Sequence, residues 1–233
     1  MSTTALSCGN VDRAARPSGD GVRWFDLPVT PTRQDLDPLL AETAERLVVH
    51  GTDADFASVV LRLLRKNRLG DLVVGYVPVT DSPAARLWGL RAGDFERALT
   101  AAPRPSALIR DDSGGVLLGA GTIVPITGQV YCDDEQVLNG SALEITISPD
   151  PDAEPLPEST PDPMNAMLDP AMDGLLVTTV RRGLLRRRSE VTRGRAVQAS
   201  FRSATVVHDG MRHPRPAEKW VWYRHTEDLQ FAR

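Results

Sequence analysis

The chain is poor in cysteine and in aromatic residues: of its 233 residues, two are cysteine and 5% are aromatic. Cys8 and Cys132 lie far apart with no companion ligand pattern, so the sequence indicates neither a disulfide framework nor a zinc site. We expect both cysteines to be buried as small apolar side chains. No apolar run is long enough for a membrane-spanning helix, and the start lacks a signal-peptide pattern. These absences predict a soluble cytoplasmic protein without a transmembrane segment.

The charged residues give a net charge of −4, which argues against a general nucleic-acid-binding protein. Lys66 and Lys219 are the only lysines, so nearly all of the basic residues are arginine. We interpret this bias as codon composition and do not use the arginine count as a sign of phosphate binding. With 41% hydrophobic residues, the chain is able to bury a substantial core in one domain or two.

The first hundred residues alternate short apolar runs with helical patterns. A helix is predicted to begin at Asp37 and Pro38, because aspartate suits the cap and proline the first helical position. A second helix is predicted over 56–64, where apolar residues repeat at helical spacing. This order predicts a parallel sheet in an α/β domain spanning residues 1–104. Its strands are expected at 2–7, 24–29, 47–49 and 71–79.

After about Pro105 the hydrophobic pattern changes to period two, which is typical of antiparallel strands. The cluster Asp111–Gly115 predicts a hairpin turn between two of these strands. We therefore predict a C-terminal antiparallel β-sandwich domain, residues 105–233, with an exposed proline-rich acidic loop at 148–173. Its strands are expected at 107–110, 116–119, 128–132, 143–148, 175–180, 196–201, 204–207 and 220–223.

The segment Arg46–Arg65, which reads as a strand, a turn and a helix, is the most informative part of the sequence. A glycine-containing turn, Gly51–Asp55, connects the apolar strand to the amphipathic helix. Such a turn presents backbone N–H groups and the positive end of the helix dipole, which together bind anions such as phosphate. A simpler interpretation makes Asp53 or Asp55 the cap of a helix that begins at Phe56.

The α/β half, the β-sandwich half and this acidic glycine turn together resemble the catalytic domain family of diacylglycerol kinases, which is related to sphingosine kinases and NAD kinases. Gly51–Asp55 is similar to the family's Gly-Gly-Asp-Gly-Thr turn and matches it at Gly51 and Asp53. Val77–Arg86 is similar to a second glycine-rich signature and keeps its proline and arginine. The resemblance implies an NAD kinase-like two-domain fold. It also implies nucleotide contacts at Gly51, Thr52, Asp53, Asp55, Thr80 and Asp81.

Two signatures nearer the C-terminus also resemble the family. Asp169–Leu176 is similar to Asp-Pro-Asp-Asp-Gly-Leu-Leu, an element that helps to place a structural metal in some bacterial members. This similarity implies Asp173 as a metal ligand. Val206–Met211 is similar to a late Asp-Gly-Glu signature. That similarity implies Asp209 as the candidate base that deprotonates an acceptor hydroxyl.

Substitutions in these turns weaken a phosphate site. Thr52 and Ala54 stand in place of glycines, whose lack of a side chain lets the backbone approach a phosphate closely. If Asp55 or Asp81 faced the same pocket, its carboxylate would repel a phosphate about 5 Å away by about 3 kcal/mol. A bridging magnesium ion would reverse the sign of that interaction.

We therefore predict a diacylglycerol kinase-like pseudoenzyme with degenerate ATP-binding motifs, which binds a small molecule, a lipid or a partner protein. The first alternative is an active ATP-dependent lipid kinase that phosphorylates a lipid hydroxyl, with ATP and magnesium as cofactors. In that version Asp53 helps to hold the metal-nucleotide complex and Asp209 is the base. The second alternative is a structural assembly subunit. Formation of a homo-oligomer is compatible with all three.

Other polar and aromatic features are interpreted as structural. His50 and His208 each precede one of these aspartates but belong to no metal-ligand spacing. The run Arg181–Arg188 is interpreted as a solvated turn between strands rather than a lipid headgroup contact. Trp220 and Trp222 are interpreted as alternating core residues of a strand rather than as a stacking surface.

Overall fold

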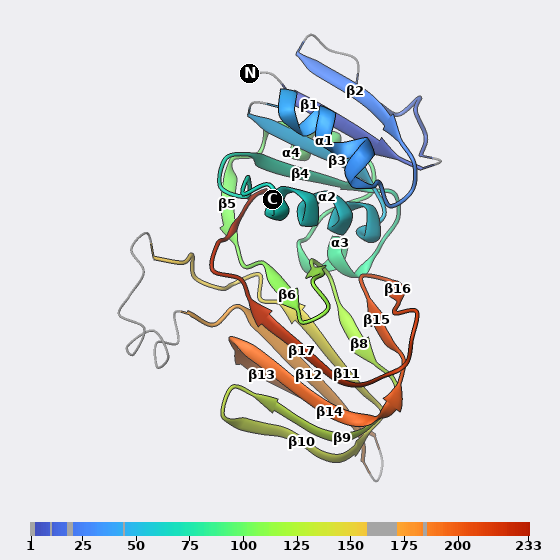
Figure 1. Ribbon diagram of the computed structural model, residues 1–233, viewed down its shortest axis with the longest axis vertical. Coiled ribbons are helices and arrows are strands. Elements are labelled where there is room, and N and C mark those ends of the chain that lie inside the picture. The colour runs from blue at the N-terminus through green and yellow to red at the C-terminus, as the bar shows by residue number, and fades with distance from the viewer. Residues whose placement is uncertain (1–2, 10, 18–20, 44, 158–171, 184–185) are drawn as a thin grey trace. The chain divides into compact units, whose positions relative to one another are not determined.

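The computed structural model describes residues 3–9, 11–17, 21–43, 45–157, 172–183 and 186–233. The chain forms two compact units, Met1–Ser106 with Glu227–Arg233 and Ala107–Thr226 (Figure 1). The sequence analysis placed the last residues in the second domain, whereas they complete the sheet of the first unit. Of the predicted loop at 148–173, residues 158–171 lie outside the described part of the chain.

The first unit contains a six-stranded sheet in the order β2-β1-β3-β4-β18-β5. All neighbouring strands are parallel except β18 and β5, which confirms the predicted parallel α/β sheet. The N-terminal strand was also predicted, and it pairs with both β2 and β3. The strands are β1 (Thr3–Cys8), β2 (Val22–Leu27), β3 (Arg46–Gly51), β4 (Val73–Pro78), β5 (Pro103–Ser106) and β18 (Leu229–Ala232).

Helices cover both faces of this sheet. On one face α2 (Asp53–Arg65) places Phe56 against Tyr76 of β4, with the ring centroids 4.4 Å apart. On the other face α4 (Phe95–Thr100) packs directly on β4. Gly75 permits this close packing, because a Cβ there would lie 2.4 Å from the carbonyl oxygen of Ala98. The sequence analysis predicted neither α4 nor the short α3 (Pro83–Leu87), whose few residues give little periodicity to detect.

The first helix, α1 (Arg33–Glu42), begins earlier than predicted. The hydroxyl and backbone amide of Thr32 donate hydrogen bonds to the Asp35 carboxylate, 2.7 and 2.8 Å long, in a capping box. The prediction of a start at Asp37 and Pro38 was wrong. The capping box fixes the first turn, so Pro38 lies inside the helix and Asp37 pairs with Arg62 instead.

The second unit consists of two six-stranded antiparallel sheets, which confirms the predicted antiparallel β half. One sheet has the order β10-β9-β14-β17-β6-β7 and the other the order β13-β12-β11-β8-β15-β16. The first contains β6 (Ile109–Asp111), β7 (Val116–Leu117), β9 (Ile126–Cys132), β10 (Glu135–Ala142), β14 (Ala196–Ala204) and β17 (Ala217–Arg224). The second contains β8 (Gly121–Ile123), β11 (Glu144–Pro149), β12 (Leu175–Arg182), β13 (Arg187–Gly194), β15 (Val206–His208) and β16 (Met211–Arg212).

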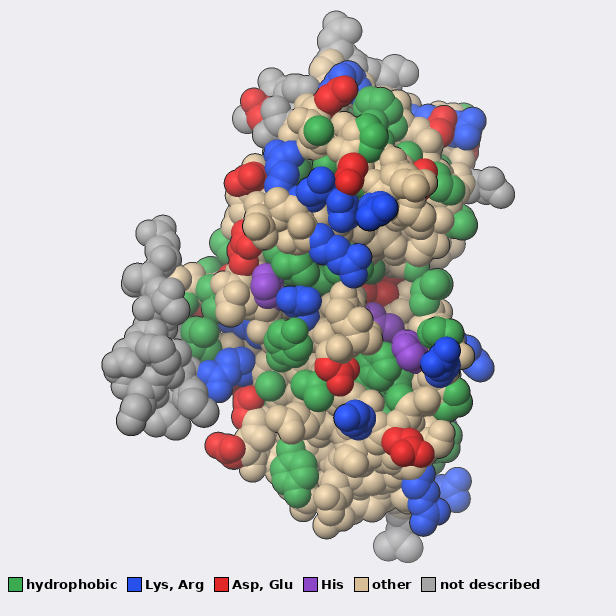
Figure 2. Space-filling view, viewed as in Figure 1, with side chains coloured by type: hydrophobic (Ala, Val, Ile, Leu, Met, Phe, Trp, Pro, Cys, Tyr) green, Lys and Arg blue, Asp and Glu red, His purple; other side chains and the backbone are tan. Residues whose placement is uncertain are grey.

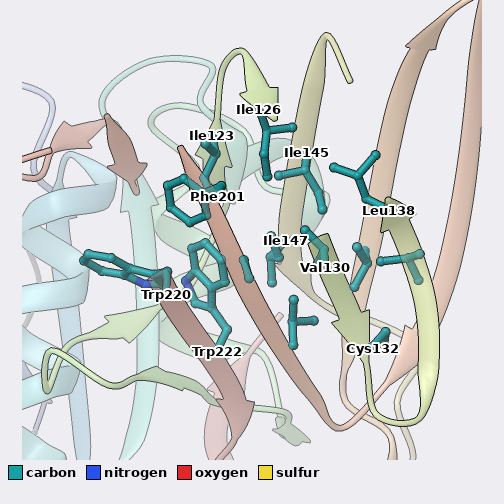
Figure 3. Close-up of a cluster of buried hydrophobic side chains, with 14 of the residues drawn as sticks. Ile123, Ile126, Val130, Cys132, Leu138, Ile145, Ile147, Phe201, Trp220 and Trp222 are labelled. Atoms are coloured by element: carbon teal, nitrogen blue, oxygen red, sulfur yellow. The ribbon is translucent and has the colours of Figure 1, made fainter. Parts of the chain in front are cut away.

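Apolar side chains from both sheets meet in one buried cluster, as Figure 3 shows. Ile145 and Ile147 of β11 point into it on alternate positions, which is the period-two pattern read from the sequence. Trp220 and Trp222 of β17 also belong to the cluster, so their interpretation as core residues is confirmed. Cys132 is buried there, and Cys8 is buried in the first unit.

The basic run at 181–188 was expected as a turn, but its two ends belong to strands β12 and β13, and residues 184–185 lie outside the described part of the chain. Arg181 lies at the end of β12 and pairs with Glu190 of β13 at 3.1 Å. Arg188 pairs with the same glutamate at 2.9 Å, so these described arginines have local partners. Within the described residues, no helix combines the length and the apolar composition that a bilayer crossing requires.

A buried aspartate holds the predicted hairpin between β6 and β7. The Asp111 carboxylate accepts hydrogen bonds from the Ser113 hydroxyl at 2.6 Å and the Gly115 amide at 2.9 Å. His208 Nε2 lies 3.0 Å from its other oxygen, as an ion-pair contact when the ring is protonated. Burial alone would raise the pKa of Asp111, but the contacts from His208, Ser113 and Gly115 lower it to about 2.

This depressed pKa predicts a pH-dependent stability difference for Asp111→Asn. The folded pKa lies below the unfolded value of 3.8, so the charged side chain stabilises the fold above that pH. The gain is lost as the pH falls through the folded pKa. We expect Asp111→Asn to lower the unfolding free energy at pH 7 by roughly 2 kcal/mol. Urea unfolding at several pH values should show the difference shrinking below pH 4, which is about the unfolded pKa.

The neighbouring Asp112→Asn is the matched control, because the Asp112 side chain is exposed. It should change the unfolding free energy by less than about 0.5 kcal/mol at any pH. An equal loss for both variants, or a loss for Asp111→Asn that does not depend on pH, would contradict the assigned role of the buried carboxylate.

Candidate functional site

A cavity of about 410 Å³ lies at the carboxyl ends of the parallel strands in the first unit. Ligands of open α/β sheets bind in this position, because the strand ends and following loops form a crevice there. The lining residues come from the ends of β1, β3 and β4, the starts of α2 and α4, the turn before α4 and the loops that follow β1, β2 and β4. They are Cys8, Gly9, Val11, Asp12, Ala15, Val29, His50, Thr52, Asp55, Pro78, Val79, Gly93 and Phe95.

The turn after β3 forms a capping box at the start of α2. Thr52 is the cap residue, and its hydroxyl accepts a hydrogen bond from the Asp55 amide. In return the Asp55 carboxylate accepts hydrogen bonds from the Thr52 amide and hydroxyl, both 2.8 Å long. The interpretation of Asp53 or Asp55 as the cap was therefore wrong, because threonine supplies the cap and Asp55 is the third residue of the helix.

Asp55 also binds a segment that is distant in the sequence. Its second carboxylate oxygen accepts a 2.6 Å hydrogen bond from the amide of Thr30, in the loop after β2. The Asp55 side chain is buried and receives three hydrogen bonds in all. Thus a carboxylate of the protein already accepts hydrogen bonds from the Thr52 amide of this turn and from the Thr30 amide beside it, at the helix start where an anionic ligand would bind.

Gly51 makes room for this carboxylate. A Cβ at Gly51 would lie 2.8 Å from Asp55 Oδ2, closer than nonbonded atoms approach, and the backbone of Gly51 is not in the left-handed region. The glycine is therefore explained by the packing of Asp55. It does not require a phosphate close to the backbone.

Asp53 faces the turn after β4. One of its oxygens accepts hydrogen bonds from the hydroxyls of Tyr76 at 2.8 Å and Ser82 at 2.6 Å, and the other accepts from the Ala84 amide at 3.0 Å. Burial, reinforced by the negative charge of Asp53, raises the pKa of Tyr76, so the phenol remains a donor. Asp53 thereby joins the end of β3 to the start of α3, since Ser82 caps that helix.

The remaining predicted nucleotide contacts lie outside the cavity lining. Thr80 and Asp81 are exposed in the turn before α3. The Asp81 carboxylate pairs with Arg86 at 2.7 Å across the surface. Of the six predicted nucleotide-contact residues, Thr52 and Asp55 line the cavity, whereas Gly51 and Asp53 lie beside it within the same turn.

The cavity lining is apolar with acidic groups. Asp12 and Asp55 are its only formally charged residues among those described. Burial, reinforced by the Asp55 carboxylate, raises the pKa of the Cys8 thiol to about 12, so this cysteine is neutral. Basic side chains of the first unit gather instead over α1 and α2, where Arg33, Arg62 and Arg65 line a small hollow (Figure 2).

His50 is a second buried polar residue of the lining, beside Asp55. Burial, together with the positive charge of Arg16, lowers its pKa, and Asp12 opposes the shift. The ring is therefore neutral near pH 7. It packs edge-on against Phe95, with centroids 4.9 Å apart, and its Nδ1 has no hydrogen-bond partner among the described residues.

The sequence analysis missed several lining residues because they belong to loops. Asp12 and Ala15 follow β1 in a segment with no periodic pattern. Val29 was expected in the strand at 24–29, but β2 ends at Leu27 and Val29 lies in the loop after it. One signal was available: in a parallel sheet the residues after each strand meet at the same edge. Applied to the predicted strand at 2–7, that rule points to Cys8 and the residues after it.

Asp209, the candidate base, lies in the second unit. Its buried carboxylate accepts hydrogen bonds from the amides of Leu118, Gly119 and Ala120, at 2.9, 2.7 and 3.1 Å. These bonds hold the loop between β7 and β8, which is a structural role. Asp209 also has a positive φ of 47°, as the residue at a tight turn between β15 and β16.

Asp173, the candidate metal ligand, is half buried before β12. Burial and the charges of Asp133 and Asp150 raise its pKa against the opposing effect of Arg195 and Arg224. Among the residues that the structure describes, no three histidine, cysteine or acidic side chains lie close enough to hold a metal ion. The preceding residues of this signature, 169–171, lie outside the described part of the chain.

Comparisons with solved structures identify the fold. A diacylglycerol kinase from Bacillus anthracis str. Sterne is 10% identical, with a TM-score of 0.61 over 98% of this chain and 96% of that one. An NAD kinase from Archaeoglobus fulgidus in complex with ATP is also 10% identical, with a TM-score of 0.58 over 99% and 93%. This chain has the fold of diacylglycerol kinases and NAD kinases.

A yeast NADH kinase complexed with NADH has the same kinase fold, at 11% identity and a TM-score of 0.55 over 99% of this chain and 83% of that one. Neither the family models nor the curated proteins to which the sequence was compared give a match. The two-domain fold expected from the sequence resemblance is confirmed. The kinase fold by itself does not assign an activity.

The contacts of Asp53 predict a large stability loss for Asp53→Asn. The amide would present N–H₂ to a hydroxyl or amide donor, so at least one buried donor would lose its acceptor. We expect the unfolding free energy to fall by about 2–4 kcal/mol. The control is Asp81→Asn, which removes an exposed ion pair and should cost less than about 1 kcal/mol. Similar losses in urea unfolding for the two variants would show that Asp53 is not held as described.

Proposed function

We propose that this chain is a non-catalytic, small-molecule-binding protein built on the fold of diacylglycerol kinases and NAD kinases. Its ligand binds in the cavity at the carboxyl edge of the first sheet. The observation that carries this proposal is the carboxylate of Asp55, which is bonded to the Thr52 amide in the turn after β3 and to the Thr30 amide in the loop after β2. An anionic phosphate would have to displace this carboxylate and its three hydrogen bonds.

The neighbouring aspartate supports the same conclusion. In the kinase alternative, Asp53 would help to hold the metal-nucleotide complex. In the structure, however, both of its oxygens accept hydrogen bonds from the protein. Tyr76 and Ser82 bond one oxygen and Ala84 the other, so a magnesium ion would have to bind a buried carboxylate with about three of its four acceptor positions occupied. Magnesium keeps its own water shell tenaciously, so direct binding there is unfavourable.

The charges of the cavity lining also disfavour binding of a phosphate group. No described residue of its lining is lysine or arginine, and two are aspartates. Phosphate groups are bound in proteins by arginine, lysine, free backbone amides or a bridging metal ion. The described lining contains neither arginine nor lysine, and the amides of Thr52 in the lining and of the neighbouring Thr30 are already bonded to Asp55.

The active lipid kinase remains the second candidate, because the kinase fold is complete over nearly the whole chain. The similar NAD kinase was solved with ATP, so proteins of this fold accommodate a nucleotide. In this version Asp209 is the base. Its carboxylate already accepts hydrogen bonds from three backbone amides, so this role requires a proton transfer to a group that also holds a loop.

Calorimetric titration with magnesium and ATP tests the proposal. We expect no saturable heat up to millimolar nucleotide, because Asp55 blocks the turn and the lining carries no positive charge. Micromolar binding to the wild type that is lost in folded Asp53→Asn protein would overturn the proposal. Circular dichroism of the variant at the titration temperature distinguishes lost binding from lost structure.

Phosphate transfer from ATP to a panel of lipid hydroxyls tests the second candidate directly. The proposal predicts no product above the level of Asp209→Asn protein. Transfer by the wild type that Asp209→Asn abolishes would establish the kinase and refute a non-catalytic role.

A further inference from the structure

The cavity at the sheet edge has the size and walls of a small-molecule site. Its volume of about 410 Å³ lies within the range of known ligand pockets. The walls are largely apolar, and Val29, Pro78 and Phe95 come from three different segments. Val29 remains 66% exposed at the rim, so an apolar ligand body would bury surface that is now in contact with water.

The charge of the lining favours a cation. Asp12 is exposed and Asp55 is buried, and no described lining residue carries a positive charge. Two arginines lie in the same loop as Asp12, but Arg13 and Arg16 both pair with Asp26. Arg16 is further held over the ring of Trp24, 5.2 Å from its centroid. These arginines therefore have an acidic partner outside the cavity, and the only formal charges of the described lining itself are the two carboxylates.

His50 adds a polar group that a ligand can use. The side chain is 5% exposed and lines the cavity, and its Nδ1 has no partner among the described residues. A buried polar atom without a partner is unfavourable, so a group that satisfies it gains affinity. Because burial lowers the pKa of His50, the ring is neutral and offers one acceptor nitrogen. In the tautomer whose Nδ1 is unprotonated, an N–H donor on the ligand matches this atom.

We propose that the cavity binds an organic cation, an ammonium or protonated heteroaromatic amine with an apolar or aromatic body. This inference rests on the proposed ligand-binding function and names the chemical class of its ligand. The apolar or aromatic part of the ligand packs against Val29, Pro78 and Phe95. The positive group faces the field of Asp12 and Asp55, and its N–H is the donor for His50. The same field disfavours carboxylates and phosphates.

Matched triads of fragments test the proposal. Each triad has one body and carries an amine, an alcohol or a carboxylate, and tryptamine, tryptophol and indole-3-acetate form one of them. Ligand-observed NMR titration of the full chain measures the affinities. We expect the amines to bind about 10-fold or more tightly than the alcohols, with the carboxylates weakest. The preference should weaken at high salt, because Asp12 is exposed.

Variants show whether the cavity is the site. Ala15→Trp fills it from an exposed lining position and should abolish amine binding. Ala14→Trp alters the neighbouring exposed residue, which does not line the cavity, and should leave binding unchanged. Val29→Trp is a second blocking variant in case Ala15→Trp does not fold. Asp12→Asn keeps an acceptor for the Ala14 amide and should weaken amines by about 3- to 10-fold while sparing alcohols.

Equal binding of the three classes, stronger binding of carboxylates, or the absence of any fragment that the blocking variants displace would each overturn this inference. None of these results changes the outcome of the titration with magnesium and ATP, which decides the proposed function. Conversely, ATP binding that is lost in folded Asp53→Asn protein would overturn the proposed function whatever the fragments show.

Discussion

The arrangement of the first unit depends on one buried carboxylate, that of Asp55. It holds the start of α2 through Thr52 and fixes the loop after β2 through Thr30. Gly51 is a glycine because this carboxylate lies against it. Since carboxylate and phosphate compete for the same N–H donors at a helix start, the interaction that stabilises the turn also removes its capacity for an anionic ligand.

Asp53 is a second internal carboxylate of this kind, and it bonds groups in and after the next strand, β4. It binds the hydroxyls of Tyr76 and Ser82 and the amide of Ala84, so the start of α3 also receives a carboxylate from the protein itself. Two acidic residues that resemble a nucleotide motif are thus internal structural groups. What remains at the sheet edge is a cavity with apolar walls, acidic charge and one neutral histidine. That composition favours a ligand unlike a nucleoside phosphate.

Local patterns in the sequence predicted most of the fold. The apolar run of β3, the helical spacing in α2 and the alternation in β11 each depend on neighbouring residues, so they are visible without the structure. The roles of the site residues depend on partners distant in sequence. Nothing near Asp55 shows that it bonds Thr30, and nothing near Asp53 shows its contact with Ala84. The start of α1 was misjudged because Pro38 is a strong local signal, whereas the capping box was the stronger constraint.

The central claim is that Asp55 occupies the anion-binding groups of the turn. NMR titration with inorganic phosphate tests it most directly, with the amide resonances of Thr30 and Thr52 observed in the wild type and in Asp55→Gly. The wild type should show no saturable shift of these resonances. The variant should show one, because removal of the carboxylate frees both N–H groups. A saturable shift in the wild type, or none in folded Asp55→Gly protein, would contradict the claim.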